Sequence, residues 1–281
     1  MEVNLIHAED FKLDGGACFG VVPKSIWNKI YPADENNMVE IATRLFLVRE
    51  DDRLILFDTG IGNKQRDKLL AYYYVANRDN LINSFTNLGI SPDDVTDVVF
   101  THLHFDHCGG AFRKNDDGEA IAVFRNANYW VSRAQWDASQ KPNQRERASY
   151  YKENLNPLME SGKLHFIEQE GNFTPNIFLH LMDGHTDGQL IPVVHYKNKT
   201  LAYVADLIPT FAHLSLPFLT SFDVRPLLSL EEKQQFLQVA ADNNYILVFE
   251  HDALHPCCTV QNTDRGAQVD ETGTLEYFMN K

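Results

Sequence analysis

The chain contains few cysteines and no long apolar run, and these two absences limit the classes of protein to which it can belong. It has 4 cysteines in 281 residues, and none of them has the spacing of a zinc knuckle. We therefore expect four free thiols and a reducing, cytoplasmic compartment. The first ten residues lack the basic and apolar segments of a signal peptide. No apolar run approaches the roughly 20 residues of a membrane-spanning helix, so no membrane partner is expected.

Positive charge is also scarce. The sequence has 25 Lys and Arg residues against 39 Asp and Glu residues, which gives a formal net charge of -14. Nucleic-acid binding depends on clustered basic side chains, because its affinity comes from counterions released from phosphates. The densest basic stretch, residues 125–147, is interrupted by Trp130, Trp136 and Asp137. These features argue against nucleic acid and against an anionic membrane surface as partners.

The sequence has no Gly/Ser/Pro-rich linker and no short repeat, which predicts a single domain over residues 1–281. Hydrophobic residues make up 44% of the chain, enough for a substantial core. Hydrophobic periodicity predicts a hairpin at 39–57, strands at 98–100, 121–124, 128–131, 163–167, 177–182, 190–195, 200–205 and 245–249, and helices at 64–75, 79–88, 132–160 and 230–243. This mixture predicts an α/β (α+β) layered sandwich and not an alternating parallel barrel.

One segment concentrates side chains that can bind metal. Residues 101–110 read Thr-His-Leu-His-Phe-Asp-His-Cys-Gly-Gly and directly follow a short buried strand. In an extended chain, residues two apart point the same way, so His102 and His104 can hold one ion. Asp106 and His107 then turn toward a second position. Imidazoles combined with carboxylates suit zinc, iron or manganese without a thiolate.

Three further candidates stand just beyond the ends of expected strands. They are His185 in a Gly-His-Thr triplet, Asp206 and His251, and each follows its own apolar run. Functional groups often occupy this position on a sheet scaffold. Together these side chains supply two imidazoles and one carboxylate that complete a metal site.

The order His-x-His-x-Asp-His, Gly-His-Thr, Asp and His resembles that of the metallo-β-lactamase-fold hydrolases, and the resemblance spans residues 58–251. It implies an αββα sandwich of two mixed sheets flanked by helices, with two metals at one edge of the sheets. The implied ligands are His102, His104 and His185 for one metal, Asp106, His107 and His251 for the other, and Asp206 as the bridge between them.

Within that superfamily the chain is similar to the branch of N-acyl-homoserine lactonases and methyl-parathion-type organophosphate hydrolases. The residues that carry this similarity are Asp14-Gly15-Gly16, Phe-Gly-Val-Val-Pro at 19–23, and Asp-Leu-Ile-Pro-Thr at 206–210 with His213. The similarity implies two divalent ions, with zinc expected and manganese, iron or cobalt as alternatives. It also implies that the ions share a hydroxide that attacks a lactone or ester carbonyl. The leading hypothesis is therefore a dinuclear-metal hydrolase of lactones or esters, for which a quorum-quenching role is one possibility.

Individual roles follow from this hypothesis. We expect Asp106, besides binding metal, to pass a proton to the leaving group, and Asp58 to orient a ligand imidazole. Some lactonases of the superfamily carry a tyrosine three residues after the bridging aspartate, where this chain has Pro209. The developing oxyanion must then be held by a metal, or by another group such as His213 or a tyrosine elsewhere. Phe19 and His213 are the expected substrate contacts, and an apolar rim around them favours small, neutral or lipophilic esters and lactones.

Other functions remain open on the same ligand set. A phosphotriester hydrolase would act on organophosphates, and an iron-dependent redox enzyme would show an iron spectrum. A metal-binding module without catalysis would bind two ions and hydrolyse no ester. A homodimer is compatible with the sequence, although nothing in it requires one.

Overall fold

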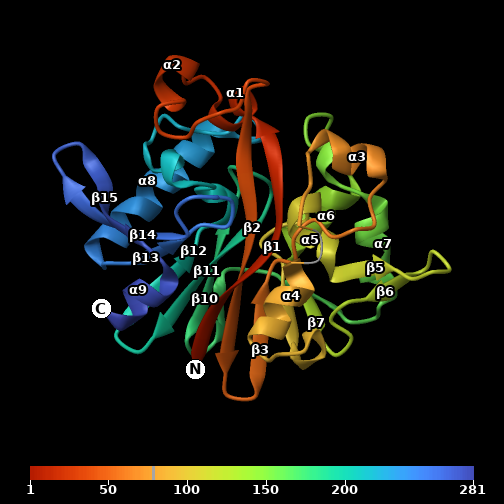
Figure 1. Ribbon diagram of the computed structural model, residues 1–281. Helices are drawn as coiled ribbons and strands as arrows, with labels where there is room; N and C mark the ends of the chain where they lie inside the picture. The colour runs from red at the N-terminus through yellow and green to blue at the C-terminus, as the bar shows by residue number, and fades with distance from the viewer. Residues whose placement is uncertain (78–79) are drawn as a thin grey trace. The chain divides into compact units, whose positions relative to one another are not determined.

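The computed structural model describes residues 1–77 and 80–281, which form two compact units. The first unit comprises Met1–Phe11 with Ala42–Gln169, and the second comprises Lys12–Ile41 with Glu170–Lys281. Each contains one large mixed sheet with helices beside it (Figure 1). No helix in the described part of the chain is long and apolar enough to cross a membrane. The expectation that residues 1–281 act as a single domain stays a prediction.

The sheet of the first unit follows the order β1-β2-β3-β4-β7-β8. Its strands are β1 (Glu2–Asp14), β2 (Met38–Glu50), β3 (Arg53–Phe57), β4 (Asp97–Val99), β7 (Asn128–Ser132) and β8 (Leu164–Ile167), and a separate small sheet pairs β5 (Phe112–Lys114) with β6 (Ala120–Ala122). The antiparallel pair β2–β3 confirms the hairpin expected at 39–57. Leu47, Leu56 and Val98 lie in the core of this unit, since the neighbouring strands bury their apolar faces there.

The register of the parallel strands brings their C-terminal ends to one edge of this sheet. Phe57 of β3 pairs with Val99 of β4, and Val99 pairs with Trp130 of β7. Asp58 directly follows β3, and Thr101 lies two residues beyond β4. The expected metal motif therefore begins at the same edge as Asp58.

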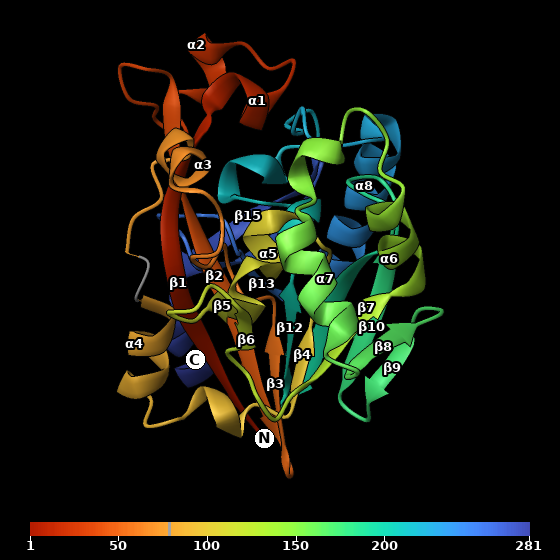
Figure 2. The same cartoon turned by 90° about the vertical axis from the view of Figure 1, so that its right-hand side faces the viewer.

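The helices of the first unit are shorter than the sequence predicts. They are α3 (Asp67–Tyr72), α4 (Asn80–Asn87), α5 (Phe105–Cys108), α6 (Arg133–Gln140) and α7 (Lys152–Glu160), with short 3-10 turns η1 (Pro92–Asp94), η2 (Gly109–Ala111) and η3 (Arg147–Ser149). The expected helix 132–160 is divided into α6, which packs beside β7 (Figure 2), and α7. Pro142 follows α6 and has no N–H to continue its hydrogen bonds. The helix expected at 79–88 corresponds to α4, and residue 79 lies outside the described residues.

The sheet of the second unit follows the order β15-β14-β13-β12-β11-β10-β9. Its strands are β9 (Gly171–Thr174), β10 (Ile177–Met182), β11 (Gln189–Tyr196), β12 (Lys199–Tyr203), β13 (Ile246–Val248), β14 (Cys257–Thr263) and β15 (Gly266–Gly273). The helices of this unit are α1 (Gly15–Phe19), α2 (Lys24–Trp27), α8 (Pro226–Asp242) and α9 (Leu275–Asn280), with the 3-10 turns η4 (Ala205–Leu207) and η5 (Phe211–Leu214). Helix α8 packs against β14 and buries Phe236 and Leu237 in the core of the unit.

Strand register also aligns the expected ligands of the second unit. Tyr203 of β12 pairs in parallel with Val248 of β13, so Asp206 and His251 each lie three residues beyond a paired position. Strand β11 is antiparallel to β12, and the turn that carries His185 joins β10 to β11. That turn therefore lies at the edge where β12 and β13 end.

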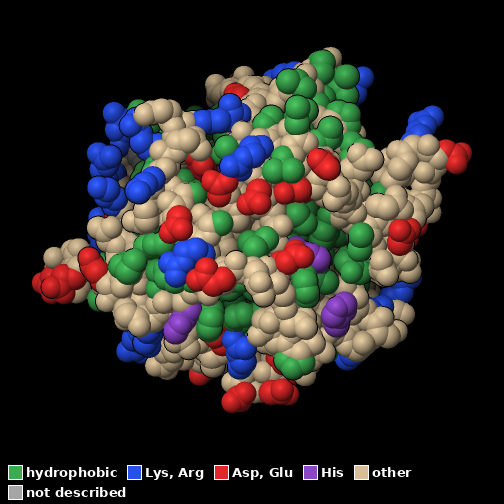
Figure 3. Space-filling model, turned by 180° about the vertical axis from the view of Figure 1, so that it is seen from behind, with side chains coloured by type: hydrophobic (Ala, Val, Ile, Leu, Met, Phe, Trp, Pro, Cys, Tyr) green, Lys and Arg blue, Asp and Glu red, His purple; other side chains and the backbone are tan. Residues whose placement is uncertain are grey.

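Strands β1, β14 and β15 were not predicted from the sequence. In β15 partly buried residues alternate with exposed ones, and its sequence Gly-Ala-Gln-Val-Asp-Glu-Thr-Gly has little apolar character. Such a strand is stabilised by pairing with β14 and not by its own hydrophobicity. On the face of the molecule in Figure 3, Asp and Glu side chains are widely spread and interleaved with Lys and Arg. This distribution agrees with the net charge of -14.

Candidate metal centre

The metal-binding motif of the first unit forms a tight turn that only glycine can close. Residues 105–108 form α5, and Gly109 and Gly110 follow it. A Cβ atom on Gly109 would lie 1.9 Å from the carbonyl oxygen of Ile61, and one on Gly110 would lie 2.0 Å from that of Thr59. Both contacts are shorter than any real Cβ contact, so the glycines allow the turn to pack against residues 59–61.

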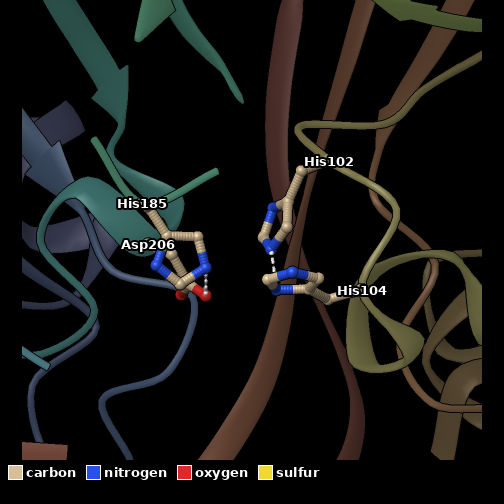
Figure 4. A group of neighbouring side chains, drawn as sticks. All are labelled: His102, His104, His185 and Asp206. Carbon is tan, nitrogen blue, oxygen red and sulfur yellow. Dashed lines mark hydrogen bonds and ion pairs between the residues drawn. The ribbon is translucent and has the colours of Figure 1, made fainter. Parts of the chain in front are cut away.

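His102 and His104 direct ring nitrogens at one another, as the spacing of two residues predicts. Nε2 of His102 lies 3.0 Å from Nδ1 of His104 (Figure 4). Nε2 of His104 lies 3.2 Å from Oε1 of Glu146, a buried carboxylate that can only accept a hydrogen bond. The proton of His104 therefore belongs on Nε2, which leaves the lone pair on Nδ1.

Asp58 fixes the two other histidines of the motif. Its carboxylate accepts hydrogen bonds from the backbone N–H of Thr101 at 2.7 Å and from the Thr101 hydroxyl at 2.6 Å. Because that hydroxyl donates to Asp58, its oxygen accepts from Nδ1 of His102, 3.1 Å away. Nδ1 of His107 donates to Asp58 at 3.1 Å. His102 and His107 thus both carry their lone pair on Nε2, the nitrogen with which each ring could bind a metal.

Asp106 completes the donors of the first unit. Its Oδ1 atom lies 3.9 Å from Nε2 of His107, and its side chain keeps 13% of its surface exposed. His102, His104 and His107 are all buried. The first unit therefore presents two donor pairs, His102 with His104 and Asp106 with His107. Cys108 packs beside them with its thiol donating to the carbonyl of Leu103, and burial raises its pKa to about 12.

In the second unit, one carboxylate lies between two histidines. Oδ2 of Asp206 lies 3.1 Å from Nε2 of His185 (Figure 4), and Oδ1 of Asp206 lies 3.0 Å from Nε2 of His251. Each oxygen therefore faces a different imidazole. A carboxylate held in this way has the geometry of a ligand that bridges two ions.

His185 is oriented from its far side by Asp223. Its Nδ1 atom donates to Oδ1 of Asp223 at 2.9 Å, which leaves Nε2 facing Asp206. Burial lowers the pKa of His185, but the charges of Asp206 and Asp223 and hydrogen bonds to them outweigh burial and raise that pKa to about 10. Without metal, a proton therefore occupies the place between His185 and the carboxylates that a cation would take. The backbone N–H groups of Asp183 and Gly184 donate to Glu232 of α8 at 2.7 and 2.9 Å, which holds the turn that carries His185.

The donor atoms fit divalent transition metals. Imidazole nitrogens and carboxylate oxygens, with no thiolate, suit zinc, manganese, iron and cobalt. In the first unit, Nε2 of His102 and Nδ1 of His104 face each other at 3.0 Å, two ring nitrogens that could both bind one cation. Such an arrangement is costly unless a proton or a cation lies between the two acceptors.

Phe19 and His213, the two expected substrate contacts, are buried and pack against each other. Phe19 is 1% exposed and packs on the rings of Trp27 and His213, with centroid distances of 4.8 and 4.9 Å. His213 is also buried; its Nε2 donates to the carbonyl of Cys18 at 2.8 Å, and its Nδ1 accepts from Thr210 at 2.8 Å. Burial lowers the pKa of His213 to about 4. Both ring nitrogens of His213 already have partners, and contact of Phe19 or His213 with substrate stays a prediction.

Two buried carboxylates that hold ligand histidines were missed from the sequence. Glu146 lies in the polar stretch Asn-Gln-Arg-Glu at 143–146, which is typical of an exposed loop, and Asp223 follows an exposed phenylalanine. Glu146 also accepts from the hydroxyl of Tyr150 at 2.5 Å. Neither position has a spacing that relates it to a ligand. Their only sequence signal is that they are acidic residues between apolar segments.

Comparison with known proteins places this arrangement in a family. The model of the metallo-beta-lactamase superfamily matches residues 42–251, which include all seven expected ligands. The chain belongs to the metallo-beta-lactamase superfamily. The expected fold class, mixed sheets with flanking helices, is confirmed, and the protein is a hydrolase of this superfamily.

Among solved structures, this superfamily member is similar to a probable metal-dependent hydrolase from Staphylococcus aureus. The two are 30% identical, with a TM-score of 0.87, and the match covers 96% of this chain and 95% of that one. The structure of AidC, a dizinc quorum-quenching lactonase in complex with a product, is 21% identical with a TM-score of 0.78 and covers 97% and 95%. An N-acyl homoserine lactonase of Bacillus cereus is 23% identical over 231 residues, which are 77% of this chain and 83% of that protein.

Proposed function

We propose that this protein is a dinuclear-metal hydrolase that opens lactones or cleaves related esters. The observation that carries the proposal is the position of Asp206, whose two oxygens face His185 and His251 separately. A single ion would use only one of these oxygens, whereas both oxygens together could serve two ions. The resemblance to lactonases supports the carbonyl centre as the point of attack.

The seven donors divide into two ligand sets in this proposal. The first unit alone offers two donors to each ion, too few for a closed site. The second unit supplies one histidine for each ion and the shared carboxylate. The proposed sets are His102, His104 and His185 for one ion, and Asp106, His107 and His251 for the other, with Asp206 common to both.

The chemistry divides between the ions and the protein. Bound divalent ions would polarise the carbonyl and make a water nucleophilic at neutral pH. Asp58, Glu146 and Asp223 hold the ligand imidazoles with their lone pairs directed inward. Asp106, the ligand carboxylate of the first unit, is 13% exposed and would carry a proton to the oxygen of the leaving alkoxide. Zinc is the metal that we propose, with manganese, iron and cobalt as alternatives.

Metal analysis of Asp206→Ala tests the bridging role. We expect bound metal to fall from two equivalents toward one or less and most activity to be lost, because both ions lose a ligand. Asp137→Ala is the matched control, since Asp137 is an exposed aspartate on α6. Two retained metals with full activity in Asp206→Ala would contradict the assignment.

A substrate panel tests the reaction. Proton release by the metal-loaded protein is followed with acyl-homoserine lactones of increasing chain length, an aryl ester and a phosphotriester. Turnover of the lactones supports the proposal, and faster turnover of longer chains supports a lipophilic substrate. If only the phosphotriester is hydrolysed, the proposed function would change from a lactonase to an organophosphate hydrolase that uses the same metal site. No turnover with iron bound would instead favour redox chemistry.

A further inference from the structure

The segment between Asp206 and Asp223 is a loop whose two ends meet at one imidazole. Asp206 contacts Nε2 of His185 and Asp223 contacts Nδ1 of the same ring. Residues 207–222 therefore leave the proposed metal centre and return to it. We call this segment the rim loop.

A fully buried lysine of α8 fastens the middle of the rim loop. Nζ of Lys233 donates to the carbonyl oxygens of His213 at 3.0 Å, Ser215 at 3.1 Å and Phe218 at 2.8 Å. An ammonium group has three donors, and these three carbonyls use them all. Burying a charge in this way is costly unless each donor is satisfied, so the loop and the lysine stabilise one another.

The rim loop is also tied to the N-terminal segment of its unit. The backbone N–H of Ser221 donates to the carbonyl of Ala17 at 2.7 Å, and His213 donates to the carbonyl of Cys18. A Cβ atom on Gly20 would lie 2.7 Å from the carbonyl of Leu219, so the two backbones are in close contact. The position of the loop therefore depends on a network that begins at Lys233.

The rim loop and the segment packed against it carry two exposed apolar side chains. Phe222 is 40% exposed and directly precedes Asp223, the partner of His185. Val21 is 94% exposed and follows Gly20, which lies against the loop. An exposed apolar side chain one residue from the partner of a proposed metal ligand is a candidate contact for the hydrocarbon part of a substrate.

We propose that Lys233 is a positioning residue for substrate recognition, which fixes the rim loop so that its apolar surface holds the acyl group of the substrate. The inference rests on the proposed hydrolysis of lactones or esters. It assigns chain-length specificity to the rim loop and to Phe222, while the metal ligands carry out the chemistry.

The adjacent residue of α8 provides a matched control. Glu232 holds the turn of His185 through Asp183 and Gly184, whereas Lys233 holds the rim loop. Changes at these two neighbouring positions should therefore have different effects. Glu232→Gln should weaken metal retention and leave the preference for chain length unchanged. Lys233→Met should change the preference for chain length and leave metal retention unchanged.

The experiment compares kcat/KM for short- and long-chain acyl-homoserine lactones in the metal-loaded protein. In Lys233→Met we expect the long-to-short ratio to fall about tenfold, mostly through KM, because an apolar pocket distinguishes acyl groups by factors of this size. Lys233→Arg should restore part of the ratio. Amide hydrogen exchange of residues 207–222 should increase in Lys233→Met while two metals stay bound.

Phe222→Ala keeps the proposal testable if Lys233→Met does not fold, because this exposed ring contributes little to stability. It should lower the same ratio, whereas Val239→Ala, an exposed apolar residue near the other end of α8, should not. An unchanged ratio in Phe222→Ala, or in a folded Lys233→Met, overturns the role of the rim loop and leaves the proposed function intact. Failure of the wild-type protein to hydrolyse any lactone or ester overturns both.

Discussion

Nδ1 of His185 lies 2.9 Å from Oδ1 of Asp223, although 38 residues separate them in the chain. The contact fixes the tautomer of His185, because the carboxylate can only accept and Nε2 is left to face Asp206. The same relationship links Glu146 to His104 and Asp58 to His107. His104, His107 and His185 are therefore oriented before any metal binds.

Replacing Asp223 tests this orientation. Asp223→Asn keeps the size of the side chain but removes its charge and allows the amide to donate to Nδ1, which favours the wrong tautomer of His185. We expect metal affinity to fall roughly 10- to 100-fold, the usual effect of losing a partner of a ligand histidine. Competition with a chelator measures the change. An affinity equal to that of the wild-type protein would show that Asp223 has only a structural role.

The corresponding change in the first unit is Glu146→Gln. It should weaken metal binding by roughly 10-fold or more and alter the spectrum of the cobalt-substituted protein, because the proton on Nε2 of His104 is no longer held by a charge. Tyr150→Phe is the control, since it removes a hydrogen bond to Glu146 but leaves the contact with His104. Equal effects of the two changes would argue against tautomer control by Glu146.

The turn behind the metal motif should not tolerate a side chain. Gly109→Ala places a Cβ atom 1.9 Å from the carbonyl oxygen of Ile61, and the backbone must move. We expect the free energy of unfolding to fall by about 3 kcal/mol or more. Gly118→Ala has open space around it and only a positive φ of 82°, so it should cost about 1 kcal/mol. Denaturant unfolding of both variants checks the difference, which a cost near 1 kcal/mol for Gly109→Ala would contradict.

Glu9 should make stability depend on pH. Burial raises its pKa from 4.5 to about 7, against the opposing hydrogen bonds from Ile61 and Gly62. The folded state then binds more protons than the unfolded state between pH 4.5 and 7, so this contribution to stability is present below pH 4.5 and is lost as the pH rises through 7.

A comparison with Glu9→Gln isolates the contribution of Glu9 to the pH dependence of stability. The stability of the wild-type protein relative to Glu9→Gln should decrease by on the order of 3 kcal/mol between pH 4.5 and 8, from 1.36 kcal/mol per pKa unit. Denaturant unfolding of both proteins at several pH values gives the difference. A constant difference across that range would show that folding does not raise the pKa of Glu9.

Local patterns in the sequence predicted the proposed ligands. His102, His104, Asp106 and His107 occur within six residues, and His185, Asp206 and His251 each follow an apolar strand. The hairpin at 39–57 was also predictable, because two apolar runs flank a short polar turn. By contrast, the stretch expected to be mostly helix at 132–160 consists of two helices, α6 and α7, and the break between them follows from Pro142, which periodicity alone does not take into account.

The sequence by itself therefore determined the donor atoms and the strands that carry them, because both depend on residues that are near neighbours in the chain. Only the tertiary structure decided which buried carboxylate orients which histidine, and that Lys233 holds the loop between Asp206 and Asp223. These pairings join residues that are tens of positions apart. They depend on the register of the strands and on the packing of α8, and no local pattern of residues encodes such distances.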